Sequence, residues 1–137
     1  MDKVFVDTSF FIALLNSRDA DHPHAVKLQE ELASLKTRKT TSEFILLELC
    51  DGLAKLSHRE LAIQVVELLQ RDGLFEIIPA SSDLWQAAWR LYKSRGDKEW
   101  GLTDCSSFII MQKLGLQTAL TTDKHFEQAG FTAALRK

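Results

Sequence analysis

The stretch "KVFVDTSFFIALL", residues 3–15, passes directly from a predicted strand into a predicted helix. Residues 3–7 form a short stretch rich in β-branched and aromatic side chains, which is typical of a buried strand. The residues that follow, "SFFIALLN", have the apolar density of a helix. Asp7 stands at the junction, where the strand is expected to end. This strand-to-helix junction raises the question of whether the rest of the chain alternates in the same way.

The remaining sequence does alternate between strand and helix patterns. Further strands are predicted at 74–79 and 117–123, with a short extended piece at 38–42 and an edge strand at 131–135. The predicted helices cover residues 21–35, 42–56, 58–73, 81–96, 103–115 and 124–130. This alternation predicts an α/β three-layer sandwich, in which helices flank a central, mostly parallel sheet of about four to five strands.

Length and composition are those of an ordinary globular domain. The chain has 137 residues, of which 45% are hydrophobic and 26% charged, so residues 1–137 are expected to form a single domain. The formal net charge is −2, whereas nucleic-acid-binding domains are usually basic. Local clusters, "KTRK" at 36–39 and Lys93 with Arg95 and Lys98, could still contact phosphates or could be solvated surface charges.

The sequence predicts a cytoplasmic protein. The N-terminus superficially resembles a signal peptide, but Asp7 interrupts its apolar region and no small-residue cleavage site follows. No run of 18 apolar residues occurs, so we expect no membrane span. Cys50 and Cys105 each lie in an apolar context and form no disulfide framework, which favours a reducing compartment.

Three aspartates stand where predicted strands end or helices begin. Asp7 ends the first strand, Asp123 ends the strand at 117–123, and Asp104 lies in the first turn of the helix at 103–115. Each has a structural explanation on its own, because an aspartate can cap a helix or complement its dipole. In a parallel sheet, however, such positions gather at one edge, where ligands bind. Carboxylates gathered there would repel one another unless a cation such as Mg²⁺ or Mn²⁺ held them.

A fourth acid is expected from the helix near residue 45, which offers two candidates. Glu43 has a structural use if Thr40 is the helix cap, because the pair then matches a capping box. Glu48 has no such use, and it lies off the apolar stripe of its helix, beside Gly52. It could belong to the site or be a solvated glutamate.

Four motifs of this sequence resemble the PIN-domain ribonuclease family, and most closely the VapC toxins of bacterial and archaeal toxin–antitoxin pairs. They occur in the family's order and together span residues 3 to about 135. The motifs are "VFVDTSFFIALL" (4–15), "TTSEFILLELCDGL" (40–53), "WGLTDCSSFIIMQKLG" (100–115) and "ALTTDKHFEQAGF" (119–131). The resemblance implies a PIN-like fold and an endoribonuclease that hydrolyses RNA phosphodiester bonds with Mg²⁺ or Mn²⁺.

The resemblance also assigns roles to individual residues. The family's catalytic and metal-binding acids correspond to Asp7, Glu48, Asp104 and Asp123. Its supporting polar positions correspond to Thr8 or Ser9, Ser107 and Thr122. One departure is Gly101, which stands where many relatives have serine, and which we expect to alter a loop turn without affecting the acids.

Partners follow from the same resemblance. Relatives commonly form homodimers and are silenced by an antitoxin protein that occludes the acidic site. The apolar stretch at 9–15 and the aromatic residues Trp85, Trp89 and Tyr92 could supply contact surface. The three aromatic residues are spaced i, i+4 and i+7, so they could equally be a core stripe.

Other functions fit the sequence less well. A haloacid-dehalogenase-type phosphatase needs a second aspartate two residues after the first, where Ser9 stands, and a receiver domain needs a lysine where Asp123 stands. The four histidines are scattered, and His58 and His125 are interpreted as surface or capping residues, so no zinc site is expected. A non-catalytic PIN-like scaffold that binds RNA or protein is the remaining alternative.

Overall fold

The computed structural model describes residues 2–136, and within them five strands form one parallel sheet. The strands lie in the order β3-β2-β1-β4-β5, and each neighbouring pair is parallel. Their bounds are β1 Lys3–Val6, β2 Arg38–Ser42, β3 Phe75–Ile78, β4 Thr118–Leu120 and β5 Thr132–Ala133. The predicted α/β sandwich is confirmed, and the extended piece expected at 38–42 is a full strand of the sheet.

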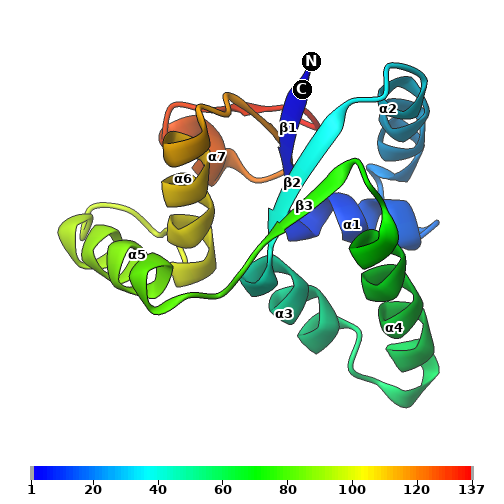
Figure 1. Cartoon of the computed structure of the whole chain (residues 1–137), viewed down its shortest axis with the longest axis horizontal. Helices are drawn as coiled ribbons and strands as arrows, with labels where there is room; N and C mark the ends of the chain where they lie inside the picture. The colour runs from blue at the N-terminus through cyan, green and yellow to red at the C-terminus, as the bar shows by residue number, and fades with distance from the viewer. Residues whose placement is uncertain (1, 137) are drawn as a thin grey trace.

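Helices cover both faces of this sheet. Figure 1 shows α6 and α7 on one side of the strands and α1, α2 and α4 on the other, with α5 packed against α6. The helices are α1 Thr8–Leu15, α2 His22–Ser34, α3 Glu43–Gly52, α4 Leu56–Arg71, α5 Ser82–Ser94, α6 Leu102–Leu114 and α7 Lys124–Gln128. Within residues 2–136, none of them has both the length and the apolar character needed to cross a membrane.

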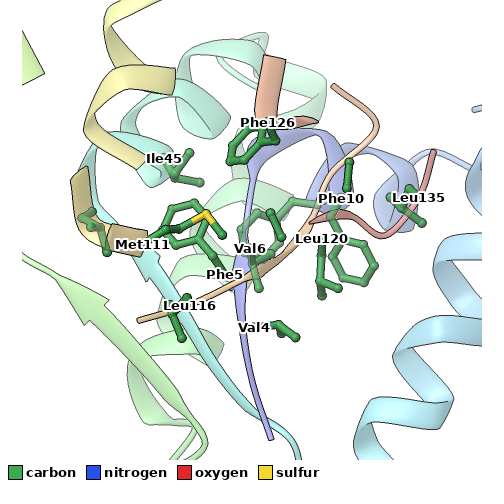
Figure 2. Packing of buried hydrophobic residues seen from close by; sticks show 14 of the residues in the cluster. Val4, Phe5, Val6, Phe10, Ile45, Met111, Leu116, Leu120, Phe126 and Leu135 are labelled. Atoms are coloured by element: carbon green, nitrogen blue, oxygen red, sulfur yellow. The ribbon is translucent and has the colours of Figure 1, made fainter. Parts of the chain in front are cut away.

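The central strand β1 runs through the hydrophobic core. Val4, Phe5 and Val6 are fully buried, because the sheet around them is covered on both faces. Figure 2 shows these residues among core side chains from several helices, including Ile45 of α3 and Phe126 of α7. This packing explains why residues 4–6 are all apolar and why the next charged residue, Asp7, comes only after the strand ends.

The strand order reverses beside β1. The chain proceeds from β1 to β2 and β3 on one side, and later returns as β4 and β5 on the other. Val6 of β1 is in register with Leu120 of β4, and the amide of Asp7 donates a hydrogen bond to the carbonyl of Leu120 at 3.2 Å. The carboxyl ends of β1 and β4 are therefore level, at the position where ligands bind in open parallel sheets.

The start of α3 differs from the predicted capping box. Thr40 lies inside β2, and the cap is Ser42, whose Oγ accepts a hydrogen bond from the Ile45 amide at 3.1 Å. The condition for that capping box, Thr40 as the helix cap, is not met, because β2 continues to Ser42. Glu43 has a different structural use, since its Oε1 accepts a hydrogen bond from the amide of Ala80 at 2.7 Å.

The basic clusters carry less free positive charge than the sequence suggests. The cluster at 36–39 lies where β2 begins, which is the edge of the sheet opposite the carboxyl ends. Lys39 is only 5% exposed, and its ammonium group donates to the carbonyl of Thr37 at 3.4 Å. Arg95 of the second cluster donates to Asp97 at 2.9 Å. Lys39 is therefore not a solvated surface charge.

Candidate active site

An open cleft of about 450 Å³ lies at the carboxyl edge of the sheet. The chain reaches it from the ends of β1 and β4, from α3, from the start of α6 and from the loop between α1 and α2. Its lining residues are Asp7, Thr8, Ser9, Ile12, Asp19, Glu48, Asp104, Thr122, Asp123 and His125. The cleft thus brings together the four acids singled out in the sequence, although they are spread over more than a hundred residues of chain.

Asp7 is the most buried of these acids, with 6% of its surface exposed. It occupies the N-cap position of α1, yet its carboxylate makes no capping hydrogen bond within the described part of the chain. Its Oδ2 instead accepts hydrogen bonds from Thr121 at 2.7 Å and from Ser9 at 3.0 Å. The explanation of Asp7 as a simple helix cap therefore fails.

Burial raises the pKa of Asp7 to about 6, because the charged form loses hydration. The hydrogen bond from Thr121 opposes this rise, the negative charge of Asp104 adds to it, and the hydrogen bond from Ser9 also opposes it. Because the pKa of Asp7 is raised overall, the effect of burial on this pKa is larger than the opposing effect of the two hydroxyl donors. A positive ion in the cleft would reverse the effect and favour the carboxylate.

Two hydroxyl groups tie the ends of β1 and β4 together. Ser9 Oγ lies 3.1 Å from Thr121 Oγ1 and accepts a hydrogen bond from the Thr122 amide at 3.0 Å. Thr121 Oγ1 accepts a hydrogen bond from the amide of Asp123 at 3.0 Å. The same hydroxyls that hold Asp7 therefore also fix the backbone that carries Asp123.

A second group combines Asp104, Asp123 and His125, whose candidate ligand atoms all lie within 4.8 Å of one another. Asp104 Oδ2 accepts a hydrogen bond from the Gly101 amide at 3.2 Å and lies 3.0 Å from His125 Nδ1. Asp123 Oδ1 accepts a hydrogen bond from the His125 amide at 2.8 Å and lies 3.3 Å from the same Nδ1. Asp104 and Asp123 therefore each serve a helix start and also face a shared space.

Burial raises the pKa of Asp104, since this side chain is largely withdrawn from water. The hydrogen bond from His125 opposes the rise, and the negative charge of Asp123 adds to it. The neighbouring charge of Asp123 thus raises the affinity of Asp104 for a proton or a cation.

Glu48 reaches the cleft from α3, whereas Glu43 on the same helix does not line it. Glu48 is exposed, and its Oε1 accepts a hydrogen bond from the hydroxyl of Thr8. The sequence left Thr8 and Ser9 as alternatives for supporting Asp7, and the structure shows that each of them contacts a different acid. Ser9 contacts Asp7, and Thr8 contacts Glu48.

The other polar residues named from the sequence have different positions. Ser107 is fully buried inside α6, where its hydroxyl donates to the carbonyl of Thr103 at 3.2 Å, and it does not line the cleft. Thr122 lines the cleft, but the hydrogen bond that joins it to the network comes from its backbone amide. The hydroxyl that contacts Asp7 belongs to the preceding residue, Thr121.

Sequence reasoning missed three residues here: Thr121, His125 and Asp19. His125 was interpreted as a surface or capping residue, but its imidazole faces two carboxylates. Its position two residues after Asp123, in the first turn of a helix, could have suggested this. Nothing in the sequence pattern points to Asp19, which lies in the loop between α1 and α2 and lines the cleft.

The donor set suits a divalent cation. Carboxylate oxygens are the preferred ligands of Mg²⁺ and Mn²⁺, and several acids converge here in a cleft open to water. Asp104, Asp123 and His125 form the compact group, and Asp7 and Glu48 line the same space without belonging to that group. A bound cation would relieve the mutual repulsion of these charges.

Comparison with known proteins covers almost the whole chain. Residues 4–132 match the family described as PIN domain. The "23S rRNA-specific endonuclease VapC20" of Mycobacterium tuberculosis is 33% identical over 129 residues, which are 93% of this chain and 95% of that protein. "Ribonuclease VapC1" of Aquifex aeolicus is 25% identical over 126 residues, which are 91% of this chain and 84% of that protein.

Solved structures agree with these matches. The crystal structure of Mycobacterium tuberculosis VapC20, titled as a sarcin-ricin loop cleaving toxin, superimposes with a TM-score of 0.81 at 29% identity and covers 94% of this chain and 96% of that one. The structure of VapBC2 from Rickettsia felis shares the fold, with a TM-score of 0.68 at 16% identity over 96% of both chains. The resemblance seen in the motifs is confirmed, and the chain belongs to the PIN domain family.

Proposed function

We propose that this chain is a divalent-metal-dependent endoribonuclease, which hydrolyses RNA phosphodiester bonds in the acidic cleft. The observation that carries this proposal is the meeting of Asp7, Glu48, Asp104 and Asp123 from separate elements in one cleft. The named relatives are a 23S rRNA-specific endonuclease and a ribonuclease, which supports the same reaction and makes 23S rRNA the first substrate to test.

The acids would bind a divalent cation, Mg²⁺ or Mn²⁺, through their carboxylate oxygens. Asp7, Asp104 and Asp123 would bind it directly, and Glu48 would bind through water or orient the attacking water. When bound, such a cation offsets the negative charge that develops on the phosphoryl group and lowers the pKa of water. The hydroxyls of Ser9 and Thr121 keep the Asp7 carboxylate in place for this role.

Water is the proposed attacking group. Among the described residues of the cleft, the hydroxyls of Thr8 and Ser9 both donate to acids and are held in that role. The nearby thiol of Cys105 is buried, and burial, together with the charge of Asp104, raises its pKa to about 11. A thiol with that pKa is protonated at neutral pH and is a poor nucleophile.

A cleavage assay with purified protein and 23S rRNA tests the proposal. The wild type is expected to cleave with Mg²⁺ or Mn²⁺ and to stop in EDTA, whereas Asp7→Asn and Asp104→Asn should lose at least about 100-fold in rate. Asp51→Asn, which removes an exposed carboxylate from α3, is the matched control and should keep full activity. Cleavage that persists in both site variants would show that the activity comes from a contaminant or from another site. A folded wild type that cleaves neither 23S rRNA nor any other RNA would favour the non-catalytic scaffold.

We also propose that the chain is the toxin of a toxin–antitoxin pair and forms a homodimer.

The surface suggested for the dimer is the aromatic face of α5, formed by Trp85, Trp89 and Tyr92. These residues are 38–45% exposed, so they are not the core stripe that their spacing also allowed. Their rings stack in series, with centroids 6.2 and 5.8 Å apart. Trp85 also lines an adjoining pocket, together with the apolar residues Phe44, Leu47 and Leu102.

A further inference from the structure

His125 presents a nitrogen to the acidic cleft at a position where a third metal ligand would stand. The residue lies in the first turn of α7, two positions after Asp123. Its Nδ1 is 3.0 Å from Asp104 Oδ2 and 3.3 Å from Asp123 Oδ1. The side chain is mostly withdrawn from solvent, which limits the number of other orientations open to the ring.

Each of the two carboxylates has a backbone donor in addition to the imidazole. Asp104 Oδ2 already accepts a hydrogen bond from the Gly101 amide, and Asp123 Oδ1 accepts one from the backbone amide of His125. Both backbone donors remain whatever side chain stands at position 125. A variant that lacks the ring therefore keeps one hydrogen bond to each carboxylate, so the loss of metal binding can be separated from the loss of the site's structure.

The separations fit neighbouring ligands of one ion. In an octahedral site with bonds of about 2.1 Å, adjacent ligand atoms lie about 3.0 Å apart. The distances from Nδ1 to the two oxygens, 3.0 and 3.3 Å, agree with that spacing. The same nitrogen cannot hold a proton and a cation at once, so cation binding requires the neutral ring with its proton on Nε2.

The geometry points to His125 Nδ1 as a ligand of the divalent cation, beside Asp104 and Asp123, and as the reason for a preference of this site for Mn²⁺ over Mg²⁺. This inference rests on the proposed metal-dependent function. Mg²⁺ strongly favours oxygen ligands and retains its water, whereas imidazole suits the transition metals. A single nitrogen among carboxylates therefore changes which metal binds best.

Pulsed electron paramagnetic resonance of Mn²⁺ bound to the full chain, without RNA, tests this directly. The wild type is expected to show the ¹⁴N coupling of one directly bound imidazole, and His125→Asn is expected to lose it. Asparagine offers an oxygen near the place of Nδ1 and keeps the backbone amide that caps Asp123, so the fold should be retained. His58→Asn, at an exposed position in α4, is the matched control and should keep the coupling.

Metal affinities give a second readout. Calorimetric titration with MnCl₂ and with MgCl₂ is expected to show that His125→Asn weakens Mn²⁺ binding by roughly tenfold or more while Mg²⁺ binding changes little. Thermal unfolding of the metal-free variant checks that it is folded.

The outcomes separate the two proposals. Mn²⁺ binding that Asp104→Asn abolishes but that shows no ¹⁴N coupling would overturn the ligand role of His125 and leave the proposed function standing. A coupling that survives in His125→Asn would also overturn it, because the nitrogen would belong to another residue. If neither Mn²⁺ nor Mg²⁺ binds the folded wild type, the metal-dependent function itself fails.

Discussion

Asp7 holds its carboxylate where water has little access. Its pKa of about 6 reflects burial that two hydroxyl donors do not fully offset. A residue chosen for stability alone would be uncharged at this position. Retaining an acid here is understandable if a cation binds to it, because the cation replaces the lost hydration.

In EDTA, Asp7→Asn is expected to stabilise the protein at neutral pH. The folded pKa of about 6 lies above the ordinary 3.8, so the folded state binds this proton more tightly than the unfolded state. The resulting stabilisation is fully present below about pH 4 and is lost as the pH rises through 6. By pH 7.5 the loss amounts to at most about 3 kcal/mol.

Urea unfolding of the wild type and of Asp7→Asn at a series of pH values measures this effect. The difference between their free energies of unfolding should grow between about pH 4 and pH 7. Asp51→Asn is the control and should follow the wild type at every pH. If the free energies of unfolding of the wild type and Asp7→Asn change with pH in the same way, burial of the Asp7 carboxylate does not destabilise the protein by the expected amount.

Thr121→Val is expected to damage the site more than Thr122→Val. Removing the Thr121 hydroxyl takes a donor from Asp7 and leaves the Asp123 amide without its acceptor, which should cost about 1–3 kcal/mol of stability. Cleavage should fall as well, since both acids lose support. Thr122→Val leaves the backbone hydrogen bond to Ser9 intact. Urea unfolding and cleavage rates of both variants measure the contrast, and equal losses would contradict it.

The sequence pattern locates the acids and names Ser9 among the candidates for supporting Asp7, but it does not identify Thr121. Asp7, Asp104 and Asp123 stand at strand ends and a helix start, which a sequence pattern locates well. Choosing between Thr121 and Thr122 requires knowing which side of β4 faces Asp7. That depends on the register with β1, which only the folded sheet defines.

Among the elements, α6 shows how a helix start can serve two purposes. Gly101 is its N-cap residue, and the Asp104 carboxylate accepts the hydrogen bond of the Gly101 amide. The helix ends at Leu114, and its C-cap residue Gly115 has a left-handed φ of 66°, which favours glycine. The charge at the head of α6 thus has a structural partner and also belongs to the cleft.

Gly101→Ser is expected to stabilise α6. The backbone there has φ −72°, which any residue adopts, and a Cβ would lie 3.8 Å from Asp104 Oδ2. A serine cap and a less flexible unfolded chain should add about 0.5–1 kcal/mol. Gly115→Ala, at positive φ, should instead lose about 1 kcal/mol. Urea unfolding measures the stability of both variants, and a Gly101→Ser variant less stable than the wild type would contradict the expected effect of the serine cap.

The elements themselves were largely predictable, because apolar periodicity marks the helices and β-branched runs mark the strands. The failure at Thr40 has a local cause. The run "TTS" continues β2 to Ser42, and Ser42 rather than Thr40 then caps α3. Three consecutive hydroxyl residues offer three possible caps, so the pattern alone did not locate the boundary.

For the whole molecule, the order of the strands creates the cleft. β1 and β4 are neighbours in the sheet but more than a hundred residues apart in sequence, and their level ends gather Asp7 and Asp123. Charge and composition did not reveal this arrangement, since the net charge is only −2. We propose that the 137 residues form one domain around this sheet.

The proposed homodimer predicts that a charge on the aromatic face of α5 will separate the subunits. Trp85→Glu should convert a dimer to a monomer in light scattering coupled to gel filtration, because an unpaired carboxylate would be buried in the interface. Leu56→Glu is the control, since Leu56 is 90% exposed on α4, away from this face. A monomeric wild type, or a dimer that survives Trp85→Glu, would contradict this surface.

Two glutamates of one helix allow a direct test of whether RNA is cleaved in the acidic cleft. Glu48 lines the cleft, whereas Glu43 lies outside it and accepts a hydrogen bond from the Ala80 amide. With Mg²⁺ or Mn²⁺, Glu48→Gln is expected to slow RNA cleavage by at least about 100-fold, and Glu43→Gln is expected to cleave at close to the wild-type rate. Equal activity of the two variants, or loss only in Glu43→Gln, would show that the acidic cleft is not where the reaction occurs.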